Sequence, residues 1–114
     1  MTKITQYLQE AKGKTLFSIE IIPPMKGQHL GELMSHIEPL MEFKPPFIEV
    51  TYHREEYIEK MVNGVSTRIP IRKRPGTLGI CASIMQKFQV DAVPHVICGG
   101  FTKEETEDFL IDLH

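Results

Sequence analysis

Residues 16–24 read LFSIEIIPP, and this short stretch decides how the chain begins to fold. Apolar, β-branched and aromatic side chains fill positions 16–22, with Ser18 and Glu20 as the interruptions. This composition is typical of a strand, and the two prolines end it because proline lacks the N–H that strand pairing needs. We therefore predict a strand over residues 16–22 with a sharp end at Pro23.

Two later stretches have the same character. Residues 47–52 read FIEVTY, and residues 92–98 read AVPHVIC and are followed by two glycines. Successive side chains of a strand point to opposite faces, so Phe47, Glu49 and Thr51 share one face of the first of these stretches. We predict a strand over each.

Helical spacing marks the segments that surround these strands. Apolar side chains recur every three or four positions in residues 1–11, 30–41 and 77–88, which predicts three helices. Pro39 should kink or end the second of them, because its ring clashes with the carbonyl four residues earlier.

The last helix begins at a clear signal. Thr102 and Glu105 form a T-x-x-E capping box, and the helix behind it carries Phe109, Leu110 and Leu113. The sequence stops inside this helix without a terminating glycine. We interpret the chain as the truncated beginning of a longer protein.

The region between the second strand and the third helix has a different composition. Asn63-Gly64 separates two runs of alternating apolar residues, 57–62 and 65–71. Asn-Gly favours the left-handed dihedrals of a type I′ turn, so an exposed β-hairpin is expected here. Pro70 would have to lie on an edge of that hairpin.

The composition excludes several classes of function. The 114 residues include 13 basic and 15 acidic side chains, a balance that does not suit neutralisation of nucleic-acid phosphates. No apolar stretch approaches the roughly 20 residues of a membrane-spanning helix, and the N-terminus has no signal-peptide core. We expect one small cytoplasmic domain. Cys81 and Cys98 do not have the spacing of a metal-binding CxxC motif, and we expect both to be small buried side chains.

The order of these elements predicts the fold class. Strands that alternate with helices form parallel sheets through right-handed crossovers. Three βα units fall short of a closed (β/α)₈ barrel, which needs about 250 residues. We therefore predict an α/β fold, a partial (β/α)₈ TIM barrel consisting of the first three βα units with a β-hairpin insertion after the second strand. Its open strand edges favour a dimer, formed through exposed or swapped elements.

Polar residues at the carboxyl ends of the strands are the candidates for chemistry, because ligands bind at that end of parallel sheets. Glu20 stands between isoleucines, and a carboxyl group desolvated in this way keeps its proton and can donate it. The alternative is that Glu20 faces solvent or pairs with a base inside the barrel. His95 is either a core histidine or a ligand contact. Glu20, His53 and His95 together could also bind a metal ion, as in a barrel hydrolase.

Three motifs resemble those of the methylenetetrahydrofolate reductase family. Residues 17–24, FSIEIIPP, resemble F-E-F-F-P-P. Residues 50–52, VTY, resemble V-T-Y-G, and residues 93–98, VPHVIC, resemble A-P-H-L-T-C. The motifs occur in the family's order on successive predicted strands. The resemblance covers most of the chain from Leu16 onward.

The resemblance implies a flavin enzyme, of which residues 1–114 are the N-terminal part of the TIM-barrel flavin domain. Glu20 would be the general acid that protonates the folate, Thr51 and Tyr52 would line the flavin, and His95 would contact the FAD. NADH or NADPH would reduce the FAD, which then passes hydride to 5,10-methylenetetrahydrofolate and yields 5-methyltetrahydrofolate. We also expect a homo-oligomer, no nucleic-acid or membrane partner because of the charge and composition, and no bound metal.

The chain departs from the family pattern in four places. Ile21 and Ile22 replace aromatic residues, His53 replaces the glycine after V-T-Y, and the loop over residues 54–74 is longer than in enterobacterial members. The family's R-G-D motif of the fourth strand is absent from these residues. A metal-dependent TIM-barrel hydrolase and a non-catalytic binding module remain as alternative functions.

Overall fold

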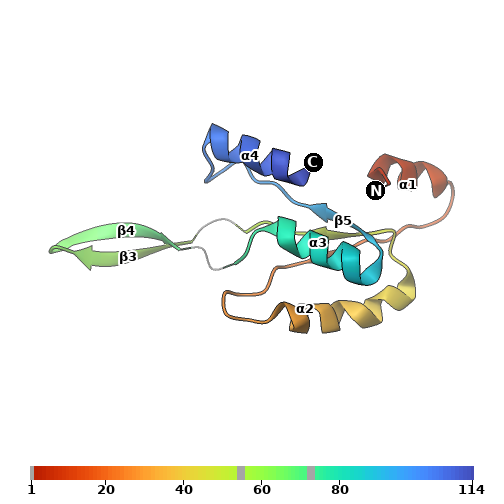
Figure 1. Cartoon of the computed structure of the whole chain (residues 1–114), viewed down its shortest axis with the longest axis horizontal. Coiled ribbons are helices and arrows are strands. Elements are labelled where there is room, and N and C mark those ends of the chain that lie inside the picture. Colours follow the sequence, from red (N-terminus) through yellow and green to blue (C-terminus); the bar gives the residue numbers. More distant parts are fainter. Residues whose placement is uncertain (1, 54–55, 72–73) are drawn as a thin grey trace.

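The computed structural model describes residues 2–53, 56–71 and 74–114. Helices and strands alternate along these residues except where the ribbon of β3 and β4 follows β2 directly and η1 follows α2, as Figure 1 shows. The elements are α1 (Ile4–Glu10), β1 (Ile19–Ile21), α2 (Leu30–Ile37), the 3₁₀ helix η1 (Glu38–Phe43), β2 (Phe47–Val50), β3 (Glu56–Val62), β4 (Val65–Ile71), α3 (Thr77–Phe88), β5 (Asp91–Pro94) and α4 (Lys103–Leu113).

The three predicted core strands form one parallel sheet. Its strand order is β1-β2-β5, with β2 in the centre. Ile19 lies opposite Ile48 in the first pair of strands, and Ile48 lies opposite Ala92 in the second. The prediction of an α/β fold with a parallel sheet is therefore confirmed.

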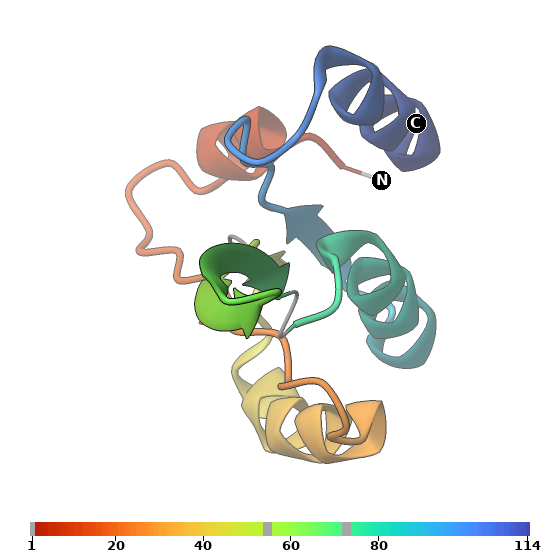
Figure 2. The same cartoon turned by 90° about the vertical axis from the view of Figure 1, so that its left-hand side faces the viewer.

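Helices α2 and α3 pack on one face of this sheet, as the view along the strands in Figure 2 shows. The core between them contains Ile37 of α2, Ile84 of α3, and Ile48 and Val50 of β2, which are all almost fully buried. Each such side chain contributes about 1.5–3 kcal/mol through removal from water. The central strand is thus the best fixed part of the fold.

All three strands of the sheet are shorter than predicted, and β2 ends at Val50 instead of Tyr52. Strand β1 begins only at Ile19, and β5 ends at Pro94 instead of continuing to Cys98. The reason is the length of β2, the strand that both of them pair with. Its last residue, Val50, accepts a hydrogen bond from the N–H of His95 at 2.9 Å, and no strand in the described part of the chain pairs with the residues after His95.

The predicted break at Pro39 is confirmed. Helix α2 ends at Ile37, and Pro39 lies in the first turn of η1, where a missing N–H costs little. Lys44 follows in a left-handed conformation with φ 50°. The prediction of one amphipathic segment over residues 30–41 therefore divides into an α-helix and a 3₁₀ helix.

The predicted hairpin is present as a separate antiparallel ribbon of β3 and β4. Val62 pairs with Val65 across the turn, and Asn63 and Gly64 have φ values of 52° and 77°, as a type I′ turn requires. Pro70 lies in β4, which is an edge strand because the ribbon has two strands. Figure 1 shows the ribbon projecting away from the sheet along the longest axis of the molecule.

Helix α1 is attached at the amino ends of β2 and β5. The Tyr7 hydroxyl and the Thr2 N–H each donate to one Asp91 carboxylate oxygen at 2.8 Å. The Tyr7 ring also packs against Phe47, with ring centroids 5.9 Å apart. A hydrogen bond with Thr2 lowers the pKa of Tyr7, but the bond to Asp91, burial and nearby carboxylates together raise it above its usual value.

The two cysteines differ, contrary to the prediction that both are buried. Cys81 lies in the core on α3, and burial raises the pKa of its thiol to about 11. Cys98 is exposed, because the chain has already left the sheet after Pro94.

The predicted cap of the last helix is present. The Thr102 hydroxyl accepts from the Glu105 N–H at 3.1 Å, and the Glu105 carboxylate accepts from the Thr102 N–H at 2.8 Å. None of the helices in the described part of the chain has the length and apolar character required to span a bilayer.

Candidate functional site

The carboxyl ends of the strands bring Thr51 and His95 to the same edge of the sheet. Thr51 donates to the Ile21 carbonyl through its N–H at 3.0 Å and through its hydroxyl at 3.2 Å. His95 donates its N–H to Val50, and its own carbonyl accepts from the hydroxyl of Thr77, a buried residue at the start of α3. Both predicted site residues therefore have a fixed backbone.

Glu20 is exposed on β1, which contradicts the expected desolvation by its isoleucine neighbours. The reason is the alternation of the strand: Ile21 points into the core, so Glu20 points to the opposite face. Ile22 is itself 55% exposed and gives Glu20 no apolar cover. The alternative in which Glu20 faces solvent describes the arrangement in this structure.

Glu49 occupies the centre of the face on which Glu20 lies. The two residues are register partners in the parallel pair of β1 and β2. Ser18 donates its hydroxyl to Glu49 Oε2 at 3.1 Å, and His95 Nε2 lies 3.9 Å from Glu49 Oε1. Glu49 thus connects the first and third motifs of the family.

Sequence reasoning did not single out Glu49 as a functional residue. The signal that could have done so is its place in a strand between two apolar residues, Ile48 and Val50, that are both fully buried. A charged residue in the middle of a central strand has to point to the other face, and that face carries the other polar groups of the strand ends.

Tyr52 follows β2 and packs away from Glu49. Its ring lies 5.4 Å from that of Phe101 and 6.0 Å from that of Phe109, both in edge-to-face arrangements. Gly76, next to α3, also lies beside the Tyr52 ring. The structure therefore separates the predicted cofactor-binding residues, with Thr51 and His95 on the sheet edge and Tyr52 in an aromatic cluster with α4.

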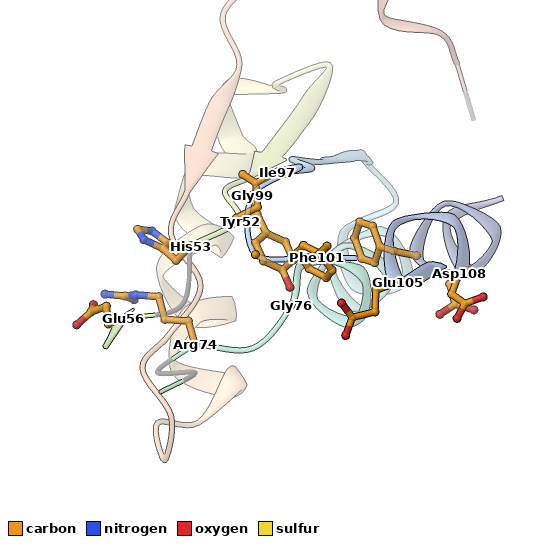
Figure 3. Close-up of a pocket in the computed structure, with 13 residues that line it drawn as sticks. Tyr52, His53, Glu56, Arg74, Gly76, Ile97, Gly99, Phe101, Glu105 and Asp108 are labelled. Atoms are coloured by element: carbon orange, nitrogen blue, oxygen red, sulfur yellow. The ribbon is translucent and has the colours of Figure 1, made fainter. Parts of the chain in front are cut away.

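A cavity of about 360 Å³ adjoins this aromatic cluster, as Figure 3 shows. Tyr52, Phe101 and Phe109 supply its apolar lining, and Asp108 and Asp112 of α4 contribute acidic groups. Glu105 of α4 also lines the cavity. The other lining residues come from the loops at the carboxyl ends of β2 and β5 and from the base of the hairpin, and include His53, Glu56, Arg74, Gly99 and Gly100.

Arg74 connects the hairpin to the first motif. Its guanidinium Nη1 donates to the carbonyl of Pro23, the first proline of the Pro-Pro end of β1. Pro23 is itself fully buried. The long insertion is therefore anchored at its exit to the loop that follows β1.

The residues of the alternative metal site do not come together. His53 lines the cavity, His95 lies beside Glu49, and Glu20 is exposed on β1. Among the residues that the structure describes, no three His, Cys, Asp or Glu side chains are placed to hold a metal ion.

The three motifs thus lie side by side on neighbouring strands. A family model described as methylenetetrahydrofolate reductase matches residues 3–114. The chain belongs to this family. The resemblance indicated by the motifs is confirmed.

Curated relatives carry the same name. The 5,10-methylenetetrahydrofolate reductase of Pectobacterium carotovorum subsp. carotovorum is 27% identical over 109 residues, which are 96% of this chain and 32% of that protein. The protein of that name from Escherichia coli (strain K12) is 28% identical over 102 residues, 90% of this chain and 29% of that protein. The chain spans about a third of the length of these relatives. No solved structure matches it.

Proposed function

We propose that these residues are the N-terminal part of a TIM-barrel flavin domain that reduces 5,10-methylenetetrahydrofolate to 5-methyltetrahydrofolate with NADH or NADPH. The observation that carries this proposal is the side-by-side placement of the three family motifs at the ends of β1, β2 and β5. A parallel sheet with helices on one face is also what the first three units of a barrel contribute.

The residues at the strand ends fit FAD by the chemistry of their donors and acceptors. Thr51 offers a hydroxyl, and His95 offers an imidazole that is 36% exposed, on a sheet edge whose backbone is held by hydrogen bonds. A flavin presents ring carbonyls, ring nitrogens and ribityl hydroxyls, which such groups can bind. FAD, when bound, supplies the transfer of hydride between the nicotinamide and the folate.

Glu20 acts in this proposal as the general acid. Its carboxyl group donates a proton to the folate nitrogen that is released when the five-membered ring opens to an iminium. Its exposure on the face opposite to α2 and α3 leaves it accessible to a substrate at the carboxyl end of the sheet. Thr51 orients the ligands, and Tyr52 bounds the site from the side of the aromatic cavity.

The outer edges of the sheet support an assembly larger than these residues. Within the described residues, β1 and β5 each pair with β2 alone and leave one edge without a strand. We propose that further strands of the barrel cover these edges and that the enzyme is a cytoplasmic homo-oligomer. Sedimentation of the protein as a monomer at high concentration would contradict the oligomer.

The experiment that tests the function uses the protein as its gene encodes it. The purified protein should contain FAD, recognised by its visible absorbance, and NADH or NADPH should bleach that absorbance in the absence of oxygen. Addition of 5,10-methylenetetrahydrofolate should restore the colour and yield 5-methyltetrahydrofolate. A colourless protein that takes up no FAD on addition would overturn the proposal.

A further inference from the structure

Glu49 is held more firmly than an ordinary surface carboxylate. Its two neighbours in β2, Ile48 and Val50, are fully buried, so the backbone at Glu49 is fixed by the core. Its side chain is 30% exposed, and its Oε2 accepts a hydrogen bond from Ser18 at 3.1 Å. The other carboxylate oxygen is left for a different partner.

That partner is His95. Nε2 of His95 lies 3.9 Å from Glu49 Oε1, which is within ion-pair reach but longer than a hydrogen bond. The backbone of His95 is held on both sides, by Val50 through its N–H and by Thr77 through its carbonyl. The imidazole ring of His95 can still rotate about its side-chain bonds, and the Glu49 carboxylate is placed to restrict that rotation.

We propose that Glu49 is the positioning residue for His95. Its carboxylate holds the imidazole through Nε2–H and leaves Nδ1 as the acceptor for an N–H or O–H group of the ligand. The inference rests on the proposed function, in which His95 contacts the flavin. A hydrogen bond made by one ring nitrogen determines which nitrogen carries the hydrogen, so a rotation of the imidazole that shortens the 3.9 Å contact to a hydrogen bond would fix both the tautomer and the orientation of the ring.

Ser18 in turn helps to orient the carboxylate of Glu49. It precedes β1 and is exposed, and its hydroxyl donates to Glu49 from the side opposite to His95. The carboxylate is thereby oriented between two neighbouring segments, one before β1 and one after β5. Glu20, the register partner of Glu49, is the other acidic group on this face of β1 and β2.

The test compares two replacements of Glu49 in the protein encoded by the gene. Glu49→Met removes the acceptor and keeps the length of the side chain, whereas Glu49→Gln keeps an oxygen acceptor. Glu38→Met is the matched control, because Glu38 pairs with Lys87 at 3.6 Å on an exposed surface of η1. Long-range ¹H–¹⁵N spectra of the histidine rings, with His95 assigned from its loss in His95→Asn, report the tautomer directly.

We expect a protonated Nε2 and an acceptor Nδ1 in the wild type, Glu49→Gln and Glu38→Met, and averaged ring signals in Glu49→Met. The dissociation constant of FAD should rise about 10-fold in Glu49→Met, by analogy with the loss of metal affinity when the carboxylate partner of a metal-ligating histidine is removed. Glu49→Gln should restore most of the affinity, which a merely structural loss would not allow.

Unchanged His95 signals and unchanged FAD affinity in Glu49→Met would overturn the inference while the proposed function stands. A wild-type protein without flavin affinity would overturn the proposed function, and the ring spectra would still decide the role of Glu49. If Glu49→Met does not fold, Ser18→Ala decides: a shift of the His95 signals in the same direction supports the inference, and identical signals contradict it.

Discussion

Glu20 of β1 and Glu49 of β2 are direct register partners, on the face of the sheet opposite to α2 and α3. Two carboxylates paired on one face are unusual for a structural surface, because like charges on directly paired residues destabilise a sheet. In a closed barrel this face is the interior. The pairing therefore marks the face on which the proposed chemistry takes place.

The attachment of α1 gives a first prediction. Tyr7→Phe removes the hydrogen bond to Asp91 and should lower the free energy of unfolding by about 1 kcal/mol. The pKa of Tyr7 is raised in the folded protein. The stabilisation by its hydrogen bond to Asp91 is therefore present at neutral pH and is lost as the pH rises above 10.0, the ordinary tyrosine value. Urea unfolding at neutral and at high pH measures both effects.

A tyrosine on the hairpin provides the control for this prediction. Tyr57 is exposed and packs under the guanidinium of Arg68, so Tyr57→Phe keeps its contacts. It should unfold like the wild type at both pH values. Equal stability of Tyr7→Phe and the wild type at neutral pH would show that the Asp91 contact does not hold α1.

The hairpin turn gives a second prediction. Gly64 has φ 77° and no atom within 4 Å of an added Cβ, so Gly64→Ala strains the backbone alone, by about 1–2 kcal/mol. Because the ribbon has only two strands, the loss should be local. Hydrogen exchange of the β3 and β4 amides should accelerate about 5- to 30-fold.

A glycine in α3 is the matched control for the turn. Gly79 also has no atom within 4 Å of an added Cβ, but it lies in a helix and has no positive φ. Gly79→Ala should stabilise the chain by about 0.5–1 kcal/mol. If Gly64→Ala leaves exchange in the ribbon unchanged, the type I′ turn does not describe the hairpin in solution.

The cysteines give a third prediction. Cys98 is exposed and should react with iodoacetamide at mildly alkaline pH, while Cys81 should stay unmodified in the folded protein. The thiolate is the reactive form, and a pKa of about 11 keeps Cys81 protonated until the pH approaches that value. Peptide mass spectrometry after a pH series measures both rates. Modification of Cys81 as fast as Cys98 would place Cys81 outside the core.

Local signals in the sequence predicted the elements well. The Asn63-Gly64 turn, the break at Pro39 and the capping box of Thr102 and Glu105 each depend on neighbours within a few residues, and all three are confirmed. Strand ends were predicted less well. Their lengths depend on pairing with β2, which the composition of β1 or β5 alone does not reveal.

The candidate site was predicted in part. The motifs predicted that Thr51 and His95 lie together at the carboxyl edge of the sheet, because parallel strands end on the same side, and the structure places them there. Of the two arrangements expected for Glu20, the desolvated one is wrong and the solvent-facing one is observed, since Ile19 and Ile21 lie on the opposite face of the strand. The contact of Glu49 with His95 joins two strands and requires their register, which no single stretch of sequence contains.

The role of Glu20 provides the most direct measurement. In the protein encoded by the gene, stopped-flow absorbance separates the two proposed reactions, flavin reduction by NADH or NADPH and flavin reoxidation by 5,10-methylenetetrahydrofolate. Glu20→Gln should leave the first reaction intact and slow the second about 10²- to 10⁴-fold, the usual contribution of a general acid. Glu42→Gln, which changes an exposed carboxylate of η1, should behave like the wild type. Folate-dependent reoxidation at the wild-type rate in Glu20→Gln would contradict the assignment of Glu20 as the proton donor.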